Sequence, residues 1–339
     1  MDVSAIILAA GKGTRMKSDM PKCAELIIDK SMVEYVVDAL EGIQVKDIVT
    51  VVGYKQEVIR NILKDRSLYA YQEIQLGTAH AVSVTKDLIG NKEGNTIIAI
   101  GDMPFITQFT YYNLLQKHIN EQADLTVLTT IHPQPHGYGR IVRDQYGNIL
   151  EIVEEKDATK EQSEINEINA AVYVVDNQKL FQHLEEIQSS NNQKEFYLTD
   201  LIKIFVQNNY KISSHIVNDY NEISGVNDKN QLCDMQKKLQ KEIITKHMLA
   251  GVTIDLPSTV EIGVNVVLEP GVVVRSGSVI LGKTIVGQNS IIGPNSEIIS
   301  SEIGKNSIIK HSVVEYSVLK EESIIGPFKH ILNNKSYWE

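Results

Sequence analysis

A glycine-rich segment near the N-terminus carries the first residues whose types and spacing could do chemistry. It runs Leu8-Ala-Ala-Gly-Lys-Gly-Thr-Arg-Met16, and Lys22 follows shortly after it. Glycine lets backbone N–H groups approach phosphate oxygens, and Lys12, Arg15 and Lys22 would add three positive charges. The segment lacks the lysine spacing of a P-loop, and Met16 stands where a dinucleotide fingerprint has its third glycine. It therefore indicates a phosphate-binding loop of another kind, with a plain solvated loop as the alternative.

Two further residues could hold a metal ion. Asp102 follows the apolar run 96–100, which would deliver its carboxylate to the end of a strand, and Asn227 lies just before a predicted helix. Mg²⁺ prefers oxygen ligands and needs only one or two from a protein, because it keeps several waters. From the residues alone, the alternatives are a turn-forming role for Asp102 before Pro104 and an N-cap role for Asn227.

The elements that must position these residues alternate between strand and helix over residues 1–227. Continuous apolar runs predict parallel strands that are covered on both faces, and they lie at 5–10, 48–52, 96–100 and 125–128. Helix-like stretches lie at 33–40, 56–63 and 79–88. This order predicts a doubly wound α/β domain, which binds ligands at the carboxyl ends of its strands. The polar stretches 156–166 and 188–194 are predicted to be exposed loops.

The chain changes character after residue 227. Apolar residues at helical spacing predict a connecting helix over 228–250 that stops at Gly251; they are Leu232, Met235, Leu239 and Ile243. Over 251–333 the apolar residues recur every six positions. Those in register are Ile262, Leu268, Val274, Ile280, Val286, Ile292 and Ile298, with a slip of one position to Ile303. This period predicts a parallel β-helix of about four three-sided coils of roughly 18 residues each. Residues 334–339 form a short tail.

The motifs of the first 227 residues resemble those of the sugar-1-phosphate nucleotidyltransferases, and among them the bacterial N-acetylglucosamine-1-phosphate uridylyltransferases. The resemblance starts with residues 8–16 and Pro21-Lys22 and continues through 72–80, 101–104, 137–141, 152–156, 167–169, 195–200 and 225–227. In this family the uridylyltransferase is the first half of a bifunctional enzyme, and a hexapeptide-repeat acetyltransferase is the second. The resemblance implies an α/β fold, with a doubly wound, Rossmann-like nucleotidyltransferase domain followed by a short left-handed parallel β-helix of hexapeptide repeats.

The resemblance also implies a role for each motif. Arg15 and Lys22 would be the catalytic cations, and Asp102 and Asn227 would hold Mg²⁺. The nucleotide would contact Leu8, Ala10, Gly11, Gly13, Gln72, Gln75, Gly77 and Thr78, of which Gln72 and Gly77 would read the uracil. The sugar would contact Gly101, Gly139, Glu154, Asn169, Tyr197 and Thr199. His80 lies among the base-reading residues and is interpreted as structural.

The implied reaction transfers uridylyl from UTP to N-acetylglucosamine 1-phosphate and gives pyrophosphate and UDP-N-acetylglucosamine, a cell-wall precursor. The sugar phosphate oxygen is already anionic at neutral pH, so its in-line attack on the α-phosphorus needs no general base. Two alternatives stay open: transfer to another sugar 1-phosphate from UTP or TTP, and a catalytically silent regulatory subunit. The chain departs from the family at Ala170-Ala171, where Thr-Gly is usual, and this affects the expected sugar preference. It departs again at Cys23-Ala24-Glu25, where Val-Leu-His is usual.

The predicted β-helix is expected to assemble three chains into a homotrimer, as it does in the resembling proteins. Acetyltransferase activity is expected to be absent, because the sequence stops soon after residues 325–331. The histidines of this region, His311 and His330, match no catalytic motif and are expected to lie on surface loops.

Composition disfavours several other classes of protein. The 339 residues carry 33 Lys plus Arg against 43 Asp plus Glu, and the net charge of −10 disfavours binding to nucleic acid or anionic membranes. Cys23 and Cys233 form no CxxC pattern, so neither a disulfide framework nor a cysteine-based zinc site is expected, and both side chains are expected to be buried. No apolar run reaches about 18 residues and no signal-peptide pattern is present, so the chain is expected to be cytoplasmic.

Overall fold

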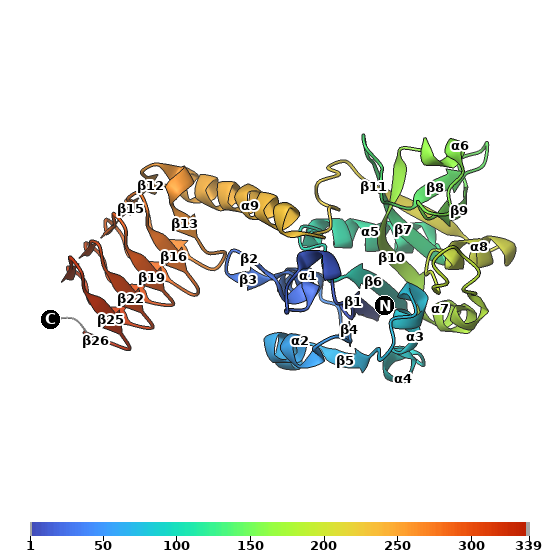
Figure 1. The fold of residues 1–339 in the computed structure, drawn as a ribbon, viewed down its shortest axis with the longest axis horizontal. Coiled ribbons are helices and arrows are strands. Elements are labelled where there is room, and N and C mark those ends of the chain that lie inside the picture. Colours follow the sequence, from blue (N-terminus) through green and yellow to red (C-terminus); the bar gives the residue numbers. More distant parts are fainter. Residues whose placement is uncertain (1, 337–339) are drawn as a thin grey trace. The chain divides into compact units, whose positions relative to one another are not determined.

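The computed structural model describes residues 2–336, and the chain divides into two compact units (Figure 1). The first unit runs to Glu25 and resumes from Ser31 to Lys229. The second unit comprises the short segment Leu26–Lys30 and the chain from Asn230 onward. The first unit therefore contains every residue of the predicted nucleotidyltransferase site.

The first unit is built on a nine-stranded sheet. Its main path follows the order β11 (Ile212–Val217), β7 (Leu125–Ile131), β10 (Glu167–Asp176), β6 (Asn95–Ile100), β1 (Val3–Leu8), β4 (Asp47–Val52) and β5 (Leu68–Tyr71). The hairpin of β8 (Arg140–Arg143) and β9 (Ile149–Val153) joins it through β10. β10 runs antiparallel to both β6 and β7, so the sheet is mixed, whereas the four predicted strands, β1, β4, β6 and β7, run parallel to one another as predicted.

Helices cover both faces of this sheet, which confirms the doubly wound α/β class (Figure 1). One core holds residues of α1 (Met32–Gly42), α2 (Gln56–Leu63) and α5 (Gln108–Glu121). The other holds residues of α3 (Thr78–Ser83), α4 (Lys86–Ile89), α7 (Asn177–His183) and α8 (Asp200–Gln207). Successive residues of β1 alternate between the two cores: Ile6 packs in the second and Ile7 in the first.

Local signals explain where these helices begin and end. α1 starts with a capping box, in which the side chain of Glu34 accepts from the backbone N–H of Ser31 at 3.0 Å. The predicted helix over 79–88 is instead the two helices α3 and α4, and it is interrupted where the Thr85 hydroxyl donates to the carbonyl of Val82 (2.7 Å). The polar stretch 156–166 also differs from the prediction, because it contains the short helix α6 (Lys160–Ser163) with its own capping box at Thr159.

The helix α9 (Lys229–Leu249) connects the two parts of the sequence. Its buried side chains are Leu232, Met235, Ile244 and His247, so the apolar face extends beyond the predicted one. Cys233 is exposed, which contradicts the prediction that both cysteines are buried; Cys23 is buried as predicted. Adjacent helical residues lie about 100° apart, so the neighbour of a buried Leu232 is turned away from the core.

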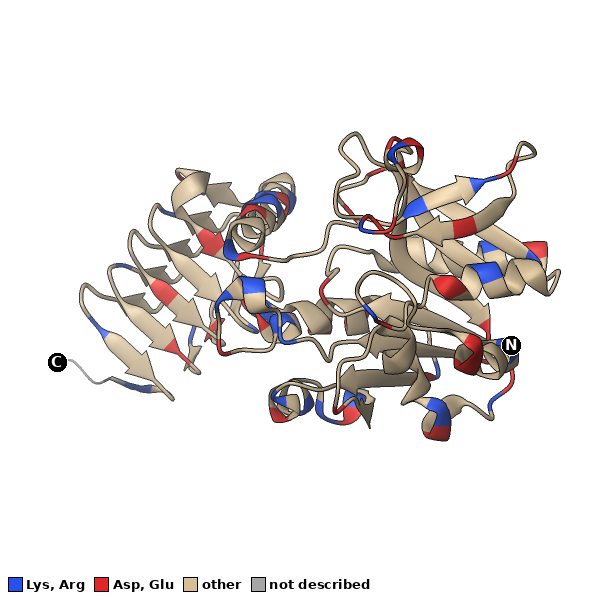
Figure 2. Ribbon diagram, turned by 45° about the vertical axis from the view of Figure 1, so that its right-hand side comes forward, with Lys and Arg blue, Asp and Glu red and all other residues tan. Residues whose placement is uncertain are grey.

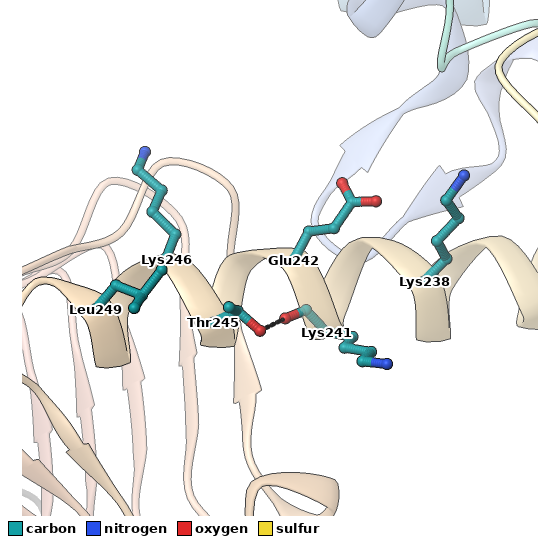
Figure 3. A pocket seen from close by; sticks show the side chains of 6 residues that line it. All are labelled: Lys238, Lys241, Glu242, Thr245, Lys246 and Leu249. Carbon is teal, nitrogen blue, oxygen red and sulfur yellow. Dashed lines mark hydrogen bonds between the residues drawn. The ribbon is translucent and has the colours of Figure 1, made fainter. Parts of the chain in front are cut away.

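The outer surface of α9 is strongly charged, and Figure 2 shows basic and acidic residues interspersed along it. An open hollow beside the helix is lined by Lys238, Lys241, Glu242, Thr245, Lys246 and Leu249, all of which are exposed (Figure 3). The Lys241 side chain points away from those of Lys238 and Lys246 (Figure 3), so their ammonium groups do not converge on one point. No helix within residues 2–336 has the length and apolar character needed to cross a membrane.

Three sheets form the β-helix that follows α9 and confirm the predicted architecture (Figure 1); their strands pair in parallel, apart from the last pairing of the second sheet, which is antiparallel. The first contains β12 (Thr253–Ile254), β15 (Val273–Val274), β18 (Ile291–Ile292), β21 (Ile308–Ile309) and β24 (Ile324–Ile325). The second contains β13 (Glu261–Ile262), β16 (Val279–Leu281), β19 (Glu297–Ile299), β22 (Val313–Glu315), β25 (His330–Leu332) and β26 (Lys335–Ser336). The third contains β14 (Val267–Leu268), β17 (Ile285–Val286), β20 (Glu302–Ile303) and β23 (Val318–Leu319).

The six-residue apolar repeat forms the core of this β-helix. All seven residues predicted in register are buried, with at most 5% of their surface exposed. Early coils have the expected length, since Ile262 pairs with Ile280, eighteen positions later. Later coils are shorter, and Ile303 pairs with Leu319, sixteen positions later. The slip of one position between Ile298 and Ile303 is the first place where the spacing of the core residues shortens.

A column of small hydroxyl side chains lies beside the apolar core and was not predicted. Each stands two positions before a core residue and is buried; they are Ser278, Thr284, Ser290, Ser296, Ser301, Ser307, Ser312 and Ser317. Several bridge successive coils: the backbone N–H of Ser307 donates to Ser290 Oγ and that of Ser317 to Ser301 Oγ, both at 3.0 Å. The bridging hydroxyls satisfy backbone donors at corners that would otherwise be buried without a partner, whereas Ser278 Oγ has no partner of its own.

The segment Leu26–Lys30 is a hairpin that belongs to the second unit although it lies early in the sequence. It is formed by β2 (Leu26–Ile27) and β3 (Lys30–Ser31), with Asp29 at its turn. The carboxylate of Asp29 accepts from the backbone N–H groups of Val264 (3.2 Å) and Gly282 (2.9 Å), which lie on two successive coils of the β-helix. One side chain thus ties the hairpin to both coils.

Candidate functional site

The carboxyl ends of β1 and β6 meet at one edge of the sheet. Leu8 pairs with Ile100 in parallel register, so the glycine-rich segment and the Gly101-Asp102 turn leave neighbouring strands side by side. Gly101 N donates to Leu8 O (3.0 Å), and a Cβ at Gly101 would lie 3.0 Å from Cys23 Sγ. The turn that carries Asp102 therefore packs directly against the first loop, as parallel strands with adjacent ends require.

Four predicted residues form a charged cluster at this edge. The Lys22 ammonium forms an ion pair with Asp102 Oδ2 and donates to Asn227 Oδ1 at 2.7 Å. The Arg15 guanidinium donates to the same Asn227 oxygen at 2.7 Å. The side chains of Lys22 and Asp102 are 13% and 16% exposed, so their charges are largely shielded from water. The structure thus brings together both predicted catalytic cations and both predicted metal ligands.

The loop geometry explains how Lys22 reaches this cluster. Gly13 has φ +67°, a left-handed conformation that favours glycine, and a Cβ there would lie 2.6 Å from Lys22 Cβ. The Lys22 stem can therefore lie flat against the glycine-rich loop. Beside it, Cys23 is buried, and burial raises the pKa of its thiol well above the usual range, so this sulfur is not a nucleophile.

Asn227 is not the N-cap of the following helix. α9 begins at Lys229, which puts Asp228 at the N-cap position and Asn227 one residue outside it. The side-chain oxygen of Asn227 instead accepts from Lys22 and Arg15. Asn227 therefore belongs to the charged cluster, and its role as a metal ligand stays a prediction.

A cavity of about 240 Å³ opens next to the cluster. It is lined by Leu8, Ala9, Ala10, Gly11, Lys22, Cys23, Gln72, Gln75, Gly77, Thr78, Ala81, Asp102 and Glu195. Most of the predicted nucleotide-binding residues are in this set, and Gly13 lies behind it against Lys22. The cavity therefore joins the predicted base-reading residues to the predicted reaction centre.

The base-reading segment is held in place by backbone contacts with the segment before α8. Gly77 has φ +120°, and a Cβ there would lie 2.5 Å from Phe196 O, so no other residue fits. Phe196 N donates to Leu76 O (2.8 Å), and Leu198 N donates to Thr78 Oγ1 (2.9 Å). These contacts bring Glu195 to the cavity wall.

The predicted sugar-binding residues form a second cluster. A Cβ at Gly139 would lie 3.5 Å from Glu154 Oε1 and 3.6 Å from Asn169 Cβ, so this glycine separates the two side chains. Thr199 Oγ1 donates to Glu154 Oε1 (3.2 Å). Burial raises the pKa of Glu154, and this hydrogen bond opposes the shift only in part. Gly101 is not in this cluster, since it packs between Leu8 and Cys23.

Asn169 is oriented by two hydrogen bonds from within β10. Its Oδ1 accepts from the backbone N–H of Ala171 (2.8 Å), and its Nδ2 donates to Tyr173 Oη (2.7 Å). Ala171 lies in a bulge between Asn169 and Tyr173, with φ +54°. Each polar atom of the carboxamide keeps one further bonding position, which a ligand could use.

Tyrosines surround these clusters. Tyr138 directly precedes Gly139 and is half-buried, and burial together with the nearby negative charge of Asp102 raises its pKa. Tyr197 is buried and its hydroxyl accepts from Gln193 Nε2 (2.6 Å), so it contacts the loop at the edge of the sugar cluster.

Sequence reasoning missed Ala9, Cys23, Ala81, Glu195 and Tyr138 as residues of the site. Ala9, Ala81 and Glu195 lie inside or next to the motifs that carried the resemblance, so their position was available as a signal. Tyr138 lies inside the 137–141 motif and Cys23 directly follows Lys22, so their position was available as well. Their residue types gave no signal, because a single cysteine or tyrosine has no pattern that marks a cavity wall.

The β-helix histidines differ from the sequence expectation in one respect. His330 lies on the strand β25 rather than on a loop, and its Nε2 is 2.8 Å from Glu315 Oε2. His311 lies between strands, with its ring 6.0 Å from that of Phe328. Neither histidine belongs to the site described above.

Comparison with known proteins agrees with this geometry. Residues 4–241 match the Nucleotidyl transferase family. The chain belongs to this family. It is 46% identical over 326 residues to the "Bifunctional protein GlmU" of Thermoanaerobacter pseudethanolicus and 42% identical over 327 residues to that of Streptococcus pyogenes serotype M18. Each comparison covers 96% of this chain and 71% of the relative. The nucleotidyl transferase match spans the charged cluster, the cavity and the sugar cluster.

Proposed function

We propose that this chain is a uridylyltransferase that transfers uridylyl from UTP to N-acetylglucosamine 1-phosphate and releases pyrophosphate. The observation that carries the proposal is the cluster of Lys22, Arg15, Asp102 and Asn227 beside the base-reading cavity, in which the Lys22–Asp102 pair is largely shielded from water. Such a cluster suits a reaction between two polyanions, since fixed positive charge offsets their repulsion. Membership of the nucleotidyl transferase family and the GlmU relatives support the same activity.

In this proposal some residues bind the two substrates and others stabilise the charge that develops during the reaction. Gln72 and Gly77 would hold the uracil, and Glu154 with Asn169 would hold the sugar, which aligns the sugar phosphate oxygen with the α-phosphorus. This oxygen is anionic at neutral pH and needs no general base. Lys22 and Arg15 would donate to phosphate oxygens as negative charge shifts onto the leaving pyrophosphate.

The charged cluster also fits a divalent cation. Asp102 and Asn227 offer one carboxylate and one amide oxygen, which are ligands that Mg²⁺ prefers. Both oxygens contact the same Lys22 ammonium, so they lie close enough to share one cation. Among the described residues no three or more His, Cys, Asp and Glu side chains gather as a metal site, which fits a cation that keeps waters and phosphate oxygens as its other ligands. Bound there, Mg²⁺ would add positive charge beside the transferred group.

The deciding experiment measures pyrophosphate release from UTP, TTP and CTP with a panel of sugar 1-phosphates. We expect the highest rate for UTP with N-acetylglucosamine 1-phosphate in the presence of Mg²⁺. Asp102→Asn and Lys22→Ala should each lower kcat by about 100-fold or more, because each removes charge aimed at the reacting phosphates. Lys46→Ala is the matched control, since Lys46 is exposed and pairs with Asp2. A variant of Asp102 or Lys22 within tenfold of the native rate would contradict the assigned role.

Asn227→Ala distinguishes a metal ligand from a structural residue. A ligand role predicts that the Mg²⁺ concentration for half-maximal rate rises, with little change in stability. A purely structural role predicts a loss of about 1 kcal/mol in the free energy of unfolding and an unchanged Mg²⁺ requirement.

A homotrimer assembled through the β-helix is the proposed quaternary state. The outward side chains of its first sheet form an apolar ladder, in which Val273, Ile291, Ile308 and Ile324 pair with one another in turn. Ile324 is 76% exposed in the single chain. Apolar faces of this kind are commonly covered by another chain. Light scattering should give three times the mass of one chain, and Ile308→Lys should lower it; a native monomer would contradict the proposal. The absence of acetyltransferase activity stays a prediction.

A further inference from the structure

Gln72 is the most constrained side chain of the base-reading segment. It directly follows β5, its backbone N–H donates to Val52 O (2.8 Å), and the residue is only 3% exposed. Its side-chain Nε2 lies 3.2 Å from Gly77 O and 3.0 Å from His80 Nδ1. Both hydrogens of this NH₂ group are therefore in use.

These contacts fix which end of the carboxamide faces the cavity. A backbone carbonyl can only accept, so the NH₂ group, and not the oxygen, must face Gly77 O. Oε1 then remains, and it accepts a hydrogen bond from no residue in the described part of the chain. Because Gln72 lines the cavity, this oxygen is the polar atom that its side chain offers to a nucleotide base.

The same logic fixes the state of His80. An NH₂ group only donates, so Nδ1 of His80 must accept from it, and the imidazole is neutral with its proton on Nε2. His80 stands in the first turn of α3, whose N-cap is the sterically constrained Gly77. The ring is not among the residues that line the base-reading cavity, and it lines a separate hollow with Ser83, Leu184, Ile187 and Phe196.

We propose that His80 is a positioning residue for base recognition: its Nδ1 and the carbonyl of Gly77 together hold the Gln72 carboxamide so that Oε1 faces the base. This inference rests on the proposed use of UTP. An acceptor at this place matches the N3–H group of uracil. Cytosine carries an unprotonated N3, and two facing lone pairs repel, so the same orientation rejects CTP. A site built to pair with a donor discriminates strongly against a ligand that lacks it.

Three variants test the role of His80. His80→Phe keeps a planar ring and removes the acceptor. His80→Asn returns an acceptor oxygen at about the place of Nδ1 and should rescue the function. Ser83→Ala is the matched control, because Ser83 Oγ donates to the backbone carbonyl of His80 (2.9 Å) and not to its ring. If the His80→Phe protein does not fold, His80→Ala replaces it, since a smaller side chain only widens the adjacent hollow.

The readout is kcat/KM for UTP and for CTP in pyrophosphate release, with thermal melting as the check on folding. For His80→Phe we expect kcat/KM for UTP to fall about fivefold, mainly through KM, which is the effect of one net hydrogen bond. The value for CTP should stay constant or rise, so that the UTP to CTP ratio falls. His80→Asn and Ser83→Ala should keep the native ratio.

Two outcomes would overturn the proposal. A native UTP to CTP ratio in a folded His80→Phe or His80→Ala protein would show that His80 does not orient Gln72. Parallel losses for both nucleotides would assign His80 a merely structural role. If the native protein itself did not use UTP, the proposed function would fail instead, so the two failures are distinguishable.

Discussion

Ala171 occupies a backbone conformation that costs free energy for any residue with a side chain. It lies in the bulge of β10 with φ +54°, where an L-amino acid brings its Cβ close to the neighbouring carbonyl. The cost of the left-handed conformation is about 1–2 kcal/mol, whereas glycine adopts it freely. Glycine also loses more conformational entropy on folding, by about 0.5–1 kcal/mol relative to alanine. Ala171→Gly should therefore stabilise the folded protein by up to about 1 kcal/mol.

The neighbouring residue provides a control of opposite sign. Ala170 is fully buried, and its φ is not positive. Ala170→Gly removes a buried methyl group and adds chain entropy to the unfolded state, so it should destabilise the protein by about 1 kcal/mol or more. The two substitutions make the same chemical change one position apart, and only the backbone conformation predicts that their effects differ in sign.

Urea unfolding followed by far-ultraviolet circular dichroism measures both effects, with the midpoint compared at equal slope. The KM for the sugar phosphate should stay near the native value in Ala171→Gly, because the backbone N–H that Asn169 accepts from is retained. A midpoint for Ala171→Gly at or below that of the native protein would refute the strain argument. So would a stabilising effect of Ala170→Gly.

Three further outcomes are expected. Tyr173→Phe removes the partner of Asn169 Nδ2 and should raise KM for the sugar phosphate about fivefold with kcat nearly constant; an equal loss in kcat would contradict a positioning role. Burial raises the pKa of Glu154, so its ionisation costs stability and the free energy of unfolding falls as pH rises through its titration. Glu154→Gln should therefore raise the melting temperature at about pH 8 while it weakens sugar-phosphate binding; a lower melting temperature would contradict this. Burial lowers the pKa of His118 from 6.5 to about 4. The free energy of unfolding should therefore fall by ~3 kcal/mol as the pH falls from 6.5 to about 4. In His118→Gln the free energy of unfolding should depend less on pH over this range.

The sequence predicted the fold well where periodicity reports burial. The hexad residues from Ile262 to Ile298 all reached the β-helix core, since a period of six leaves little freedom in which side chain points inward. The antiparallel strand β10 was not among the predicted strands; it lies between the parallel strands β6 and β7, and that place depends on chain connections that a local apolar run does not record. Cys233 was misplaced because the prediction rested on the general preference of cysteine for buried positions, whereas its place next to the buried Leu232 turns it away from the core.

The site was predicted mainly through its motifs, and the structure adds the contacts between them. Lys22, Asp102 and Asn227 are far apart in sequence. No local pattern shows that the Lys22 ammonium contacts both of the other side chains. The partnership of Gln72 with His80 was also hidden, since it depends on a strand end meeting the first turn of a helix. Pairings of this kind follow from tertiary packing, which a single sequence does not record.

The hairpin at Leu26–Lys30 determines how this protein can be divided into fragments. A cut after residue 229 would not yield the first unit intact, because the fragment would still carry five residues that belong to the other unit. The Asp29 carboxylate would lose the two backbone amides from which it accepts. A fragment designed for expression or for domain exchange would therefore need this loop shortened or redesigned. The hairpin directly follows the loop that bears Lys22, so any such redesign must leave residues 22–25 unchanged.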